Sequence, residues 1–220
     1  MNRPAAACLA ACIAAGTMLT AAAAATVRFR VVDFAGKPIK DAIVYAVPDT
    51  PLPPAKPRTA IIDQVNRQFV PQINVVQVGT YVDFPNSDNI LHSVYSFSPA
   101  KTFVLRLYAG KTEPPVRFNK PGIVVMGCQI HDTMIAWLLV VKTPYFGKTN
   151  AAGLLVLHHL RAGRYRMHAW DVSMRKVTAS RPLVVTAGGP TRQITFTLKA
   201  GRMPRHGPTI PGMSAGMGMQ

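Results

Sequence analysis

Short runs of alternating apolar and polar residues, separated by turns rich in Gly and Pro, fill most of this 220-residue chain. Alternation with a period of two places every second side chain on one face of a sheet, whereas an amphipathic helix needs apolar residues every three or four positions. No stretch combines a helical period with capping residues. The chain is therefore predicted to be all-β, with strands spaced as in β-sandwiches. The expected strands cover residues 27–32, 42–47, 73–78, 81–84, 103–107, 123–126, 135–141, 154–157, 164–170, 182–186 and 193–198.

The first 25 residues have the pattern of a signal peptide. Arg3 gives a positive start, an Ala-rich apolar stretch follows, and small residues at 21–25 offer cleavage sites. A membrane anchor and a lipoprotein with Cys12 as the lipidated residue are the alternatives, and the shortness of the apolar stretch disfavours both. No later segment is long and apolar enough to span a bilayer. We expect a periplasmic or secreted protein without stable membrane insertion.

Cysteine usage follows from this targeting. Cys8 and Cys12 leave with the signal peptide, so the mature chain keeps only Cys128 and forms no internal disulfide. An unpaired thiol in an oxidising compartment is a liability unless it is buried or occupied. Binding a metal ion is one way to occupy it.

The charge balance constrains the partners. The formal net charge is +16, and Glu113 is the single glutamate of the chain. Such a surface favours acidic partners. The basic residues are scattered, with no run of five Lys or Arg and none of the aromatic interleaving that a nucleic-acid groove uses. Nucleic-acid binding is therefore not expected.

The segment Cys128-Gln129-Ile130-His131-Asp132-Thr133-Met134 is the sharpest chemical signal. A thiolate, an imidazole and a thioether follow one another at three-residue spacing, so one tight loop can point all three at a common centre. Soft sulfur with imidazole selects copper over hard cations, and a His₂Cys plane with a weak axial Met defines a blue-copper site. In this composition, the coincidence of His and Met at these two spacings has odds of about one in a thousand. The alternative is a buried cysteine beside an unrelated His and Met on a turn.

The loop lacks one histidine, and His92 is the candidate. It follows the turn 85–88, which comes after a strong strand. A ligand on a strand that is distant from the loop in sequence would make the site rigid. The other histidines are less suitable: His158 and His159 are neighbours on a strand and so face opposite sides, and His168 lies within a strand far downstream. His206 lies in the C-terminal tail.

Residues 66–142 resemble plastocyanin-like cupredoxins. The likeness to the first ligand half rests on Phe69-Val70-Pro71, Val82-Asp83-Phe84 and His92-Ser93-Val94, and the second half is carried by Pro121-Gly122 and the Cys128 loop. The short loop spacing is that of amicyanin, and proteins associated with methylamine utilisation are more similar still. The resemblance implies a Greek-key β-sandwich holding one type 1 copper through His92, Cys128, His131 and Met134. It also implies a one-electron carrier rather than an enzyme, with His131 nearest the surface as the electron port. The basic surface is expected to steer acidic redox proteins to it.

Two positions depart from the family pattern. Ser93 stands where many members have an Asn that ties the two ligand loops together, and a serine forms fewer hydrogen bonds. Asp132 stands where amicyanin-like loops often have Pro, so an anion is expected beside the copper edge and should lower the reduction potential.

The flanks resemble a carboxypeptidase-regulatory-like, transthyretin-like β-sandwich. The likeness rests on Gly36-Lys37-Pro38-Ile39, on Thr149-Asn150-Ala151-Ala152-Gly153 and on Gly163-Arg164-Tyr165. We expect the copper domain to be inserted into this sandwich; one extended sandwich or two tandem pieces are the alternatives. The expected division is residues 1–25 as signal peptide, 26–50 with 143–200 as the flanking sandwich, 58–142 as the cupredoxin domain, and 201–220 as a disordered Met-rich tail.

Two other functions compete with electron transfer. A periplasmic copper chaperone or buffer would suit the Met-rich tail, and a binding module with an empty cupredoxin-like site would hold no copper. A multicopper enzyme would need additional His-x-His clusters, and a metal-free hydrolase would need a Ser/His/acid constellation; the sequence offers neither. Ile130, Ile135 and Trp137 are expected either to line a docking patch or to pack in the core.

Overall fold

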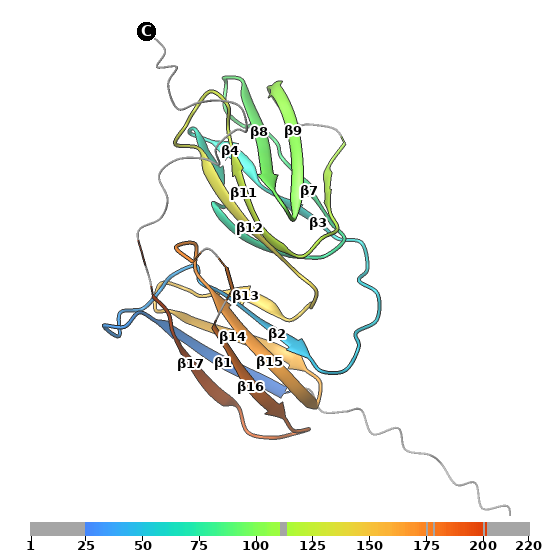
Figure 1. Ribbon diagram of the computed structural model, residues 1–220, viewed down its shortest axis with the longest axis vertical. Coiled ribbons are helices and arrows are strands. Elements are labelled where there is room, and N and C mark those ends of the chain that lie inside the picture. The colour runs from blue at the N-terminus through green and yellow to red at the C-terminus, as the bar shows by residue number, and fades with distance from the viewer. Residues whose placement is uncertain (1–24, 111–113, 175, 178, 200, 202–220) are drawn as a thin grey trace, which may run out of the picture.

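The computed structural model describes residues 25–110, 114–174, 176–177, 179–199 and 201 (Figure 1). All of its regular elements are strands, so the all-β prediction is confirmed for this part of the chain. No helix in it is long and apolar enough to cross a membrane. The expected signal peptide and most of the expected tail lie outside the described residues.

In chain order the strands are β1 (Ala25–Val32), β2 (Ile43–Pro48), β3 (Thr59–Ile61), β4 (Asp63–Val65), β5 (Gln68–Val70), β6 (Ile73–Gln77), β7 (Thr80–Asp83), β8 (His92–Ser98), β9 (Lys101–Tyr108), β10 (Val116–Phe118), β11 (Gly122–Gly127), β12 (Ile135–Val141), β13 (Phe146–Lys148), β14 (Leu154–Leu160), β15 (Gly163–Trp170), β16 (Ala179–Val185) and β17 (Arg192–Thr197).

Strands β3 to β12 form the upper sandwich of Figure 1. One sheet has the order β6-β12-β11-β8-β9, a smaller one has the order β10-β7-β3, and β4 pairs with β5. The apolar side chains that alternate along these strands meet between the sheets in one core. Its largest fully buried members are Phe69, Phe84, Phe118, Ile62, Met126, Met134 and Leu138.

The remaining strands form a second sandwich, the lower one in Figure 1. β1 pairs with β14 and β17, and β2 pairs with β13 and β15, which also pairs with β16. The two strands that precede the Pro-rich segment 49–58 are thus hydrogen-bonded only to strands that follow residue 145. Phe29, Val44, Leu160 and Met167 are among the buried residues of this second core.

Strand β12 joins the two sandwiches because both of its faces are buried. Ala136, Leu138 and Val140 point into the core of the upper sandwich. The residues between them pack in a separate cluster with side chains of the lower sandwich; the cluster consists of Ile43, Ile73, Ile135, Trp137, Leu139, Val141, Trp170 and Val172. A strand covered on both sides reads as a continuous apolar run, which is why 135–141 carries no polar residue.

Every strand expected from the sequence is present, with ends that differ by a few residues. The sequence did not predict β8, which carries His92. Its run of seven residues includes Ser93 and Ser96, and both serines are fully buried. Short strands such as β3, β4 and β13 were also missed, because three residues give too little pattern to recognise.

Candidate metal centre

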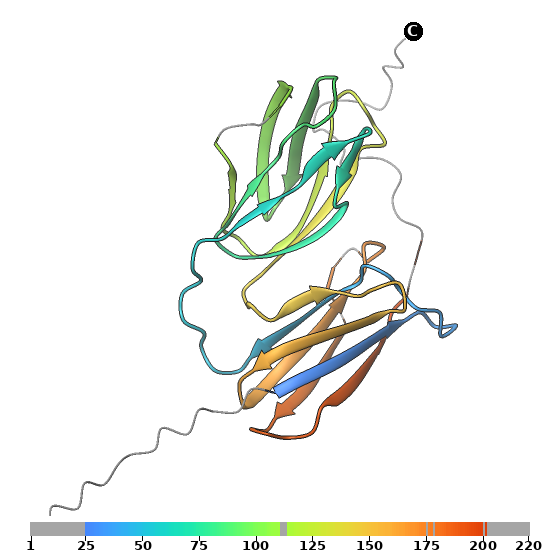
Figure 2. The same ribbon diagram turned by 180° about the vertical axis from the view of Figure 1, so that it is seen from behind.

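Two segments bring the predicted ligands to the upper end of the upper sandwich in Figure 1, which Figure 2 shows from behind. His92 is the first residue of β8, and Cys128 directly follows β11. His131 and Met134 lie in the loop that leads from Cys128 to β12, which is closed by a 2.9 Å hydrogen bond from Met134 N to His131 O. The sheet pairs β8 with β11, so it fixes the spacing between His92 and the loop.

His92, Cys128 and His131 form a cluster of the kind that holds a metal ion. The two Nδ1 atoms lie 3.1 Å apart, and Cys128 Sγ lies 3.9 Å from that of His92 and 3.8 Å from that of His131. A first-row ion makes bonds of about 2.1 Å to nitrogen and about 2.3 Å to sulfur, and at near-trigonal angles such bonds span separations of this size. The donor set and its dimensions therefore fit a single metal ion, which His92, Cys128 and His131 would hold.

Met134 is buried in the same core cluster as Cys128, with 1% of its surface exposed. The structure therefore brings the two N donors and the S donor together and places the fourth predicted ligand in the core cluster that contains Cys128. A soft N₂S plane suits copper better than calcium or magnesium, which prefer oxygen.

Asp88 contacts the imidazole of His92 on the side that faces away from Cys128. Its Oδ2 lies 2.8 Å from Nε2 of His92, which leaves Nδ1 directed at Cys128 and His131. The same carboxylate accepts hydrogen bonds from the backbone N–H groups of Asn66 and Arg67, at 2.6 and 2.9 Å. These three contacts lower the pKa of Asp88, the Arg67 N–H bond contributing most, so the carboxylate stays charged.

Asn66 and Arg67 form the two-residue turn between β4 and β5. Both have positive φ, 53° and 56°, as a type I′ hairpin requires. Such a conformation is unfavourable for a residue as long as Arg, and the carboxylate of Asp88 satisfies the two N–H groups that the turn points toward the ligand wall. The hairpin, Asp88 and His92 thus form one connected support.

Ser93 links the two ligand segments. Its hydroxyl accepts a 2.8 Å hydrogen bond from Gln129 N and donates to Cys128 Sγ at 3.7 Å. Serine therefore keeps, at this position, the cross-link expected of an asparagine. In general, a hydrogen bond donated to a cysteine sulfur favours the thiolate, which is the form that binds metal ions.

His131 is the only one of the four predicted ligands that is not fully buried. Burial of its ring lowers the pKa of His131, and the nearby His92 and Arg67 lower it further, which favours the neutral imidazole that can bind a metal. The exposed edge of this ring connects the site with the surface.

Tyr95 packs over the strand end that carries Cys128. A side chain on Gly127 would place Cβ 2.9 Å from the Tyr95 ring, so only glycine fits below it. This contact sets how closely β11 approaches β8 just before the thiolate.

The apolar residues Ile130, Ile135 and Trp137, expected either at the surface around His131 or in the core, do not all lie in the same place. Ile130 is exposed, and Leu91 next to His92 is exposed as well. Ile135 and Trp137 do not reach this surface, because they face the lower sandwich and are buried there. For these two residues the packing alternative is the one observed.

Sequence reasoning singled out all four candidate ligands but missed the support. Asp88 has no signal of its own in the sequence. The pair Asn66-Arg67, between two short strands, resembles a hairpin turn only after β4 and β5 are recognised.

Comparison of the sequence with protein-family models and with curated proteins found no match. Among solved structures, a copper-containing nitrite reductase from Thermus scotoductus SA-01 superposes on 52% of this chain at 21% identity and a TM-score of 0.36. This chain covers 28% of that protein. A purple cupredoxin from Nitrosopumilus maritimus superposes on 37% of this chain and over 98% of its own length, at 19% identity and a TM-score of 0.33. A mutant fern plastocyanin matches 37% of this chain and 99% of its own, at 18% identity and a TM-score of 0.32. Similarity this low does not by itself assign a function.

Proposed function

We propose that the protein carries single electrons through one type 1 copper held by His92, Cys128, His131 and Met134. The observation that supports this proposal is that two histidine Nδ1 atoms and one cysteine sulfur lie within 3.1 to 3.9 Å of one another. Bound copper would supply the Cu(II)/Cu(I) couple. The role of the protein is to hold the same donors in both states, so that little rearrangement accompanies the electron.

The burial of the site favours transfer of the electron over transfer of the metal. His92 is fully buried, and Cys128 and Met134 expose 2% and 1% of their surface. A chaperone must hand over its ion through ligand exchange, and that exchange would require Asp88, Ser93 and the loop to open. An electron needs only the exposed edge of His131. The copper chaperone therefore stands as the second candidate.

We further propose a periplasmic or secreted location and acidic redox partners that approach near His131. The net charge of +16 supports electrostatic attraction of such partners. Arg67, Leu91 and Ile130 are exposed in this region and offer a cation beside apolar contacts.

For the remainder of the chain we propose that residues 58–142 form a cupredoxin domain inserted in a carboxypeptidase-regulatory-like sandwich made of 26–50 and 143–200. The pairing of β1 and β2 with β13 to β17 supports this division. The flanking sandwich would then close only after the copper domain has been synthesised.

The test is the visible absorption spectrum of the mature protein loaded with Cu(II), beside Cys128→Ser. We expect an intense thiolate-to-copper band that is absent in the variant. His158→Ala is the matched control, because this exposed histidine lies on β14 in the other sandwich, and it should keep the band. Copper bound without the band would favour the chaperone, and no bound copper would overturn both functions.

A further inference from the structure

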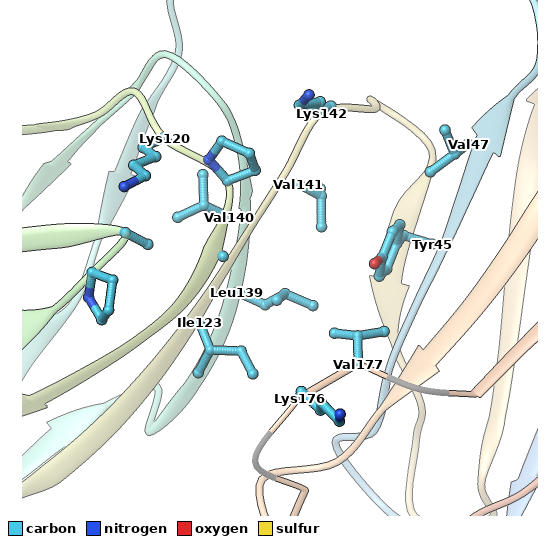
Figure 3. Close-up of a pocket in the computed structure, with 14 residues that line it drawn as sticks. Tyr45, Val47, Lys120, Ile123, Leu139, Val140, Val141, Lys142, Lys176 and Val177 are labelled. Carbon is cyan, nitrogen blue, oxygen red and sulfur yellow. The ribbon is translucent and has the colours of Figure 1, made fainter.

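A cavity of about 570 Å³ lies where the two sandwiches diverge (Figure 3). It opens beside the tightly packed cluster around Trp137 and Trp170. One wall comes from the ends of β11 and β12, and the other from β2 and the segment 176–177. A volume of this size is typical of pockets that bind small organic ligands, which run from about 300 to 1,000 Å³.

Both walls are apolar. Ile123, Leu139 and Val141 line the side of the upper sandwich, and Val47 and Val177 line the opposite side (Figure 3). Ile123, Val47 and Val177 keep part of their surface accessible. Burial of this surface would favour a ligand with an apolar body by about 25 cal/mol for each Å² removed from water.

The charged residues of the cavity are all cations. Lys120, Lys142 and Lys176 line it and are exposed, and none of its lining residues is acidic. Within the described residues, none of these three lysines has an ion pair with a carboxylate. Long lysine side chains can cover apolar surface while their ammonium groups remain free to meet an anion at the rim.

Tyr45 adds a polar group between the walls. Its ring stacks on His168 at a centroid distance of 4.8 Å, which fixes its orientation. The hydroxyl points into the gap between the two walls (Figure 3). A phenol hydroxyl can donate a hydrogen bond to a carboxylate oxygen.

We propose that this cavity binds a free amphipathic carboxylate, with its acyl chain between the apolar walls and its head group among Lys120, Lys142 and Lys176. The chain's own C-terminal tail is a poorer occupant, because residues 201–220 contain Arg202 and Arg205 and no acidic residue. The cavity is separate from the candidate metal centre: β11 runs from Gly122 at the cavity wall to Gly127 beside Cys128, and these five residue steps span about 16–17 Å.

The experiment is calorimetric titration of the full mature protein with dodecanoate below its micelle concentration, beside dodecyltrimethylammonium, which has the same apolar chain and the opposite charge. We expect saturable binding of dodecanoate at one site and none of the cation. Equal binding of both amphiphiles, or binding of neither, would overturn the proposal.

Variants locate the site. Val47→Trp fills the cavity and should abolish binding, whereas Val104→Trp, at an exposed position of β9, should leave it unchanged. The pair Lys120→Gln and Lys142→Gln should weaken binding roughly tenfold. The pair Arg28→Gln and Lys37→Gln removes equal charge at exposed positions that do not line the cavity and should have little effect; an equal loss in both pairs would show general charge attraction and exclude this cavity. The copper band of each variant is measured in parallel, so failure here is distinguishable from failure of the electron-transfer proposal.

Discussion

Asp88 and His92 are joined at 2.8 Å on the side of the imidazole that faces away from Cys128. The carboxylate fixes the tautomer of the ring, since a proton on Nε2 leaves Nδ1 free as a metal ligand. Its own position is set by two backbone N–H groups of the β4–β5 turn. A ligand on one strand is thereby oriented by a hairpin more than twenty residues earlier in the chain.

Asp88→Asn tests this support. The amide keeps the shape but loses the charge and one of the acceptors that serve Asn66, Arg67 and His92. We expect copper affinity to fall about 10- to 100-fold, as for other partners of metal-binding histidines. Competitive titration against a chelator measures the loss. Asp132→Asn is the control, because Asp132 is an exposed carboxylate next to His131; an equal loss in both variants would contradict an orienting role for Asp88.

Ser93→Ala tests the link between the ligand segments. The variant removes the acceptor of Gln129 N and the donor to Cys128 Sγ. We expect a loss of about 1 kcal/mol in the free energy of unfolding and a shift in the energy of the thiolate-to-copper band. Ser96→Ala is the matched control, since Ser96 is equally buried on the same strand and its hydroxyl accepts a 3.2 Å hydrogen bond from Ser98 N. The idea fails if the band does not move in Ser93→Ala or moves as much in Ser96→Ala.

Trp170→Ala tests the packing of the two sandwiches. Trp170 exposes 1% of its surface, packs in the cluster with Trp137, and donates from Nε1 to Met174 O at 3.0 Å. Removing it should lower the free energy of unfolding by about 3–5 kcal/mol in urea denaturation. Phe34→Ala, at a position 77% exposed, should change it by less than about 0.5 kcal/mol. A small effect of Trp170→Ala would mean that the two sandwiches are weakly coupled.

We expect the free energy of unfolding to depend on pH through the titration of His168. Burial against Tyr45 lowers its pKa below the ordinary value of 6.5, and Arg166 lowers it further. At pH values between the two pKa values the unfolded chain binds more protons than the folded one, so this contribution to stability is present above about pH 6.5 and is lost as the pH falls through the lowered pKa. His168→Phe keeps the stacking and should flatten the fall in melting temperature below pH 6.5. His158→Phe is the matched control on an exposed strand position; an unchanged profile in His168→Phe would refute the assignment.

The strands and the candidate ligands could be recognised in the sequence for different reasons. Alternation along 164–170 and the unbroken apolar run 135–141 each reflect which faces are covered, so the pattern alone located β15 and β12. The Cys128 loop could be recognised because its three donors are close in sequence. Strand β8 could not be predicted, because the polar residues Ser93 and Ser96 interrupt the apolar pattern that indicates a buried strand. Contacts such as Asp88 with Asn66 depend on how distant hairpins meet, and no local pattern records that.

The two-sided burial of β12 has a consequence for anyone who wishes to excise the half of the chain that carries the candidate metal centre. A fragment ending near residue 142 would keep its own core but present Ile135, Trp137, Leu139 and Val141 to water as one unbroken stripe along an inner strand. Such a stripe invites self-association, so the recombinant fragment should precipitate or dimerise where the intact chain stays monodisperse. The two halves are best regarded as one expression unit.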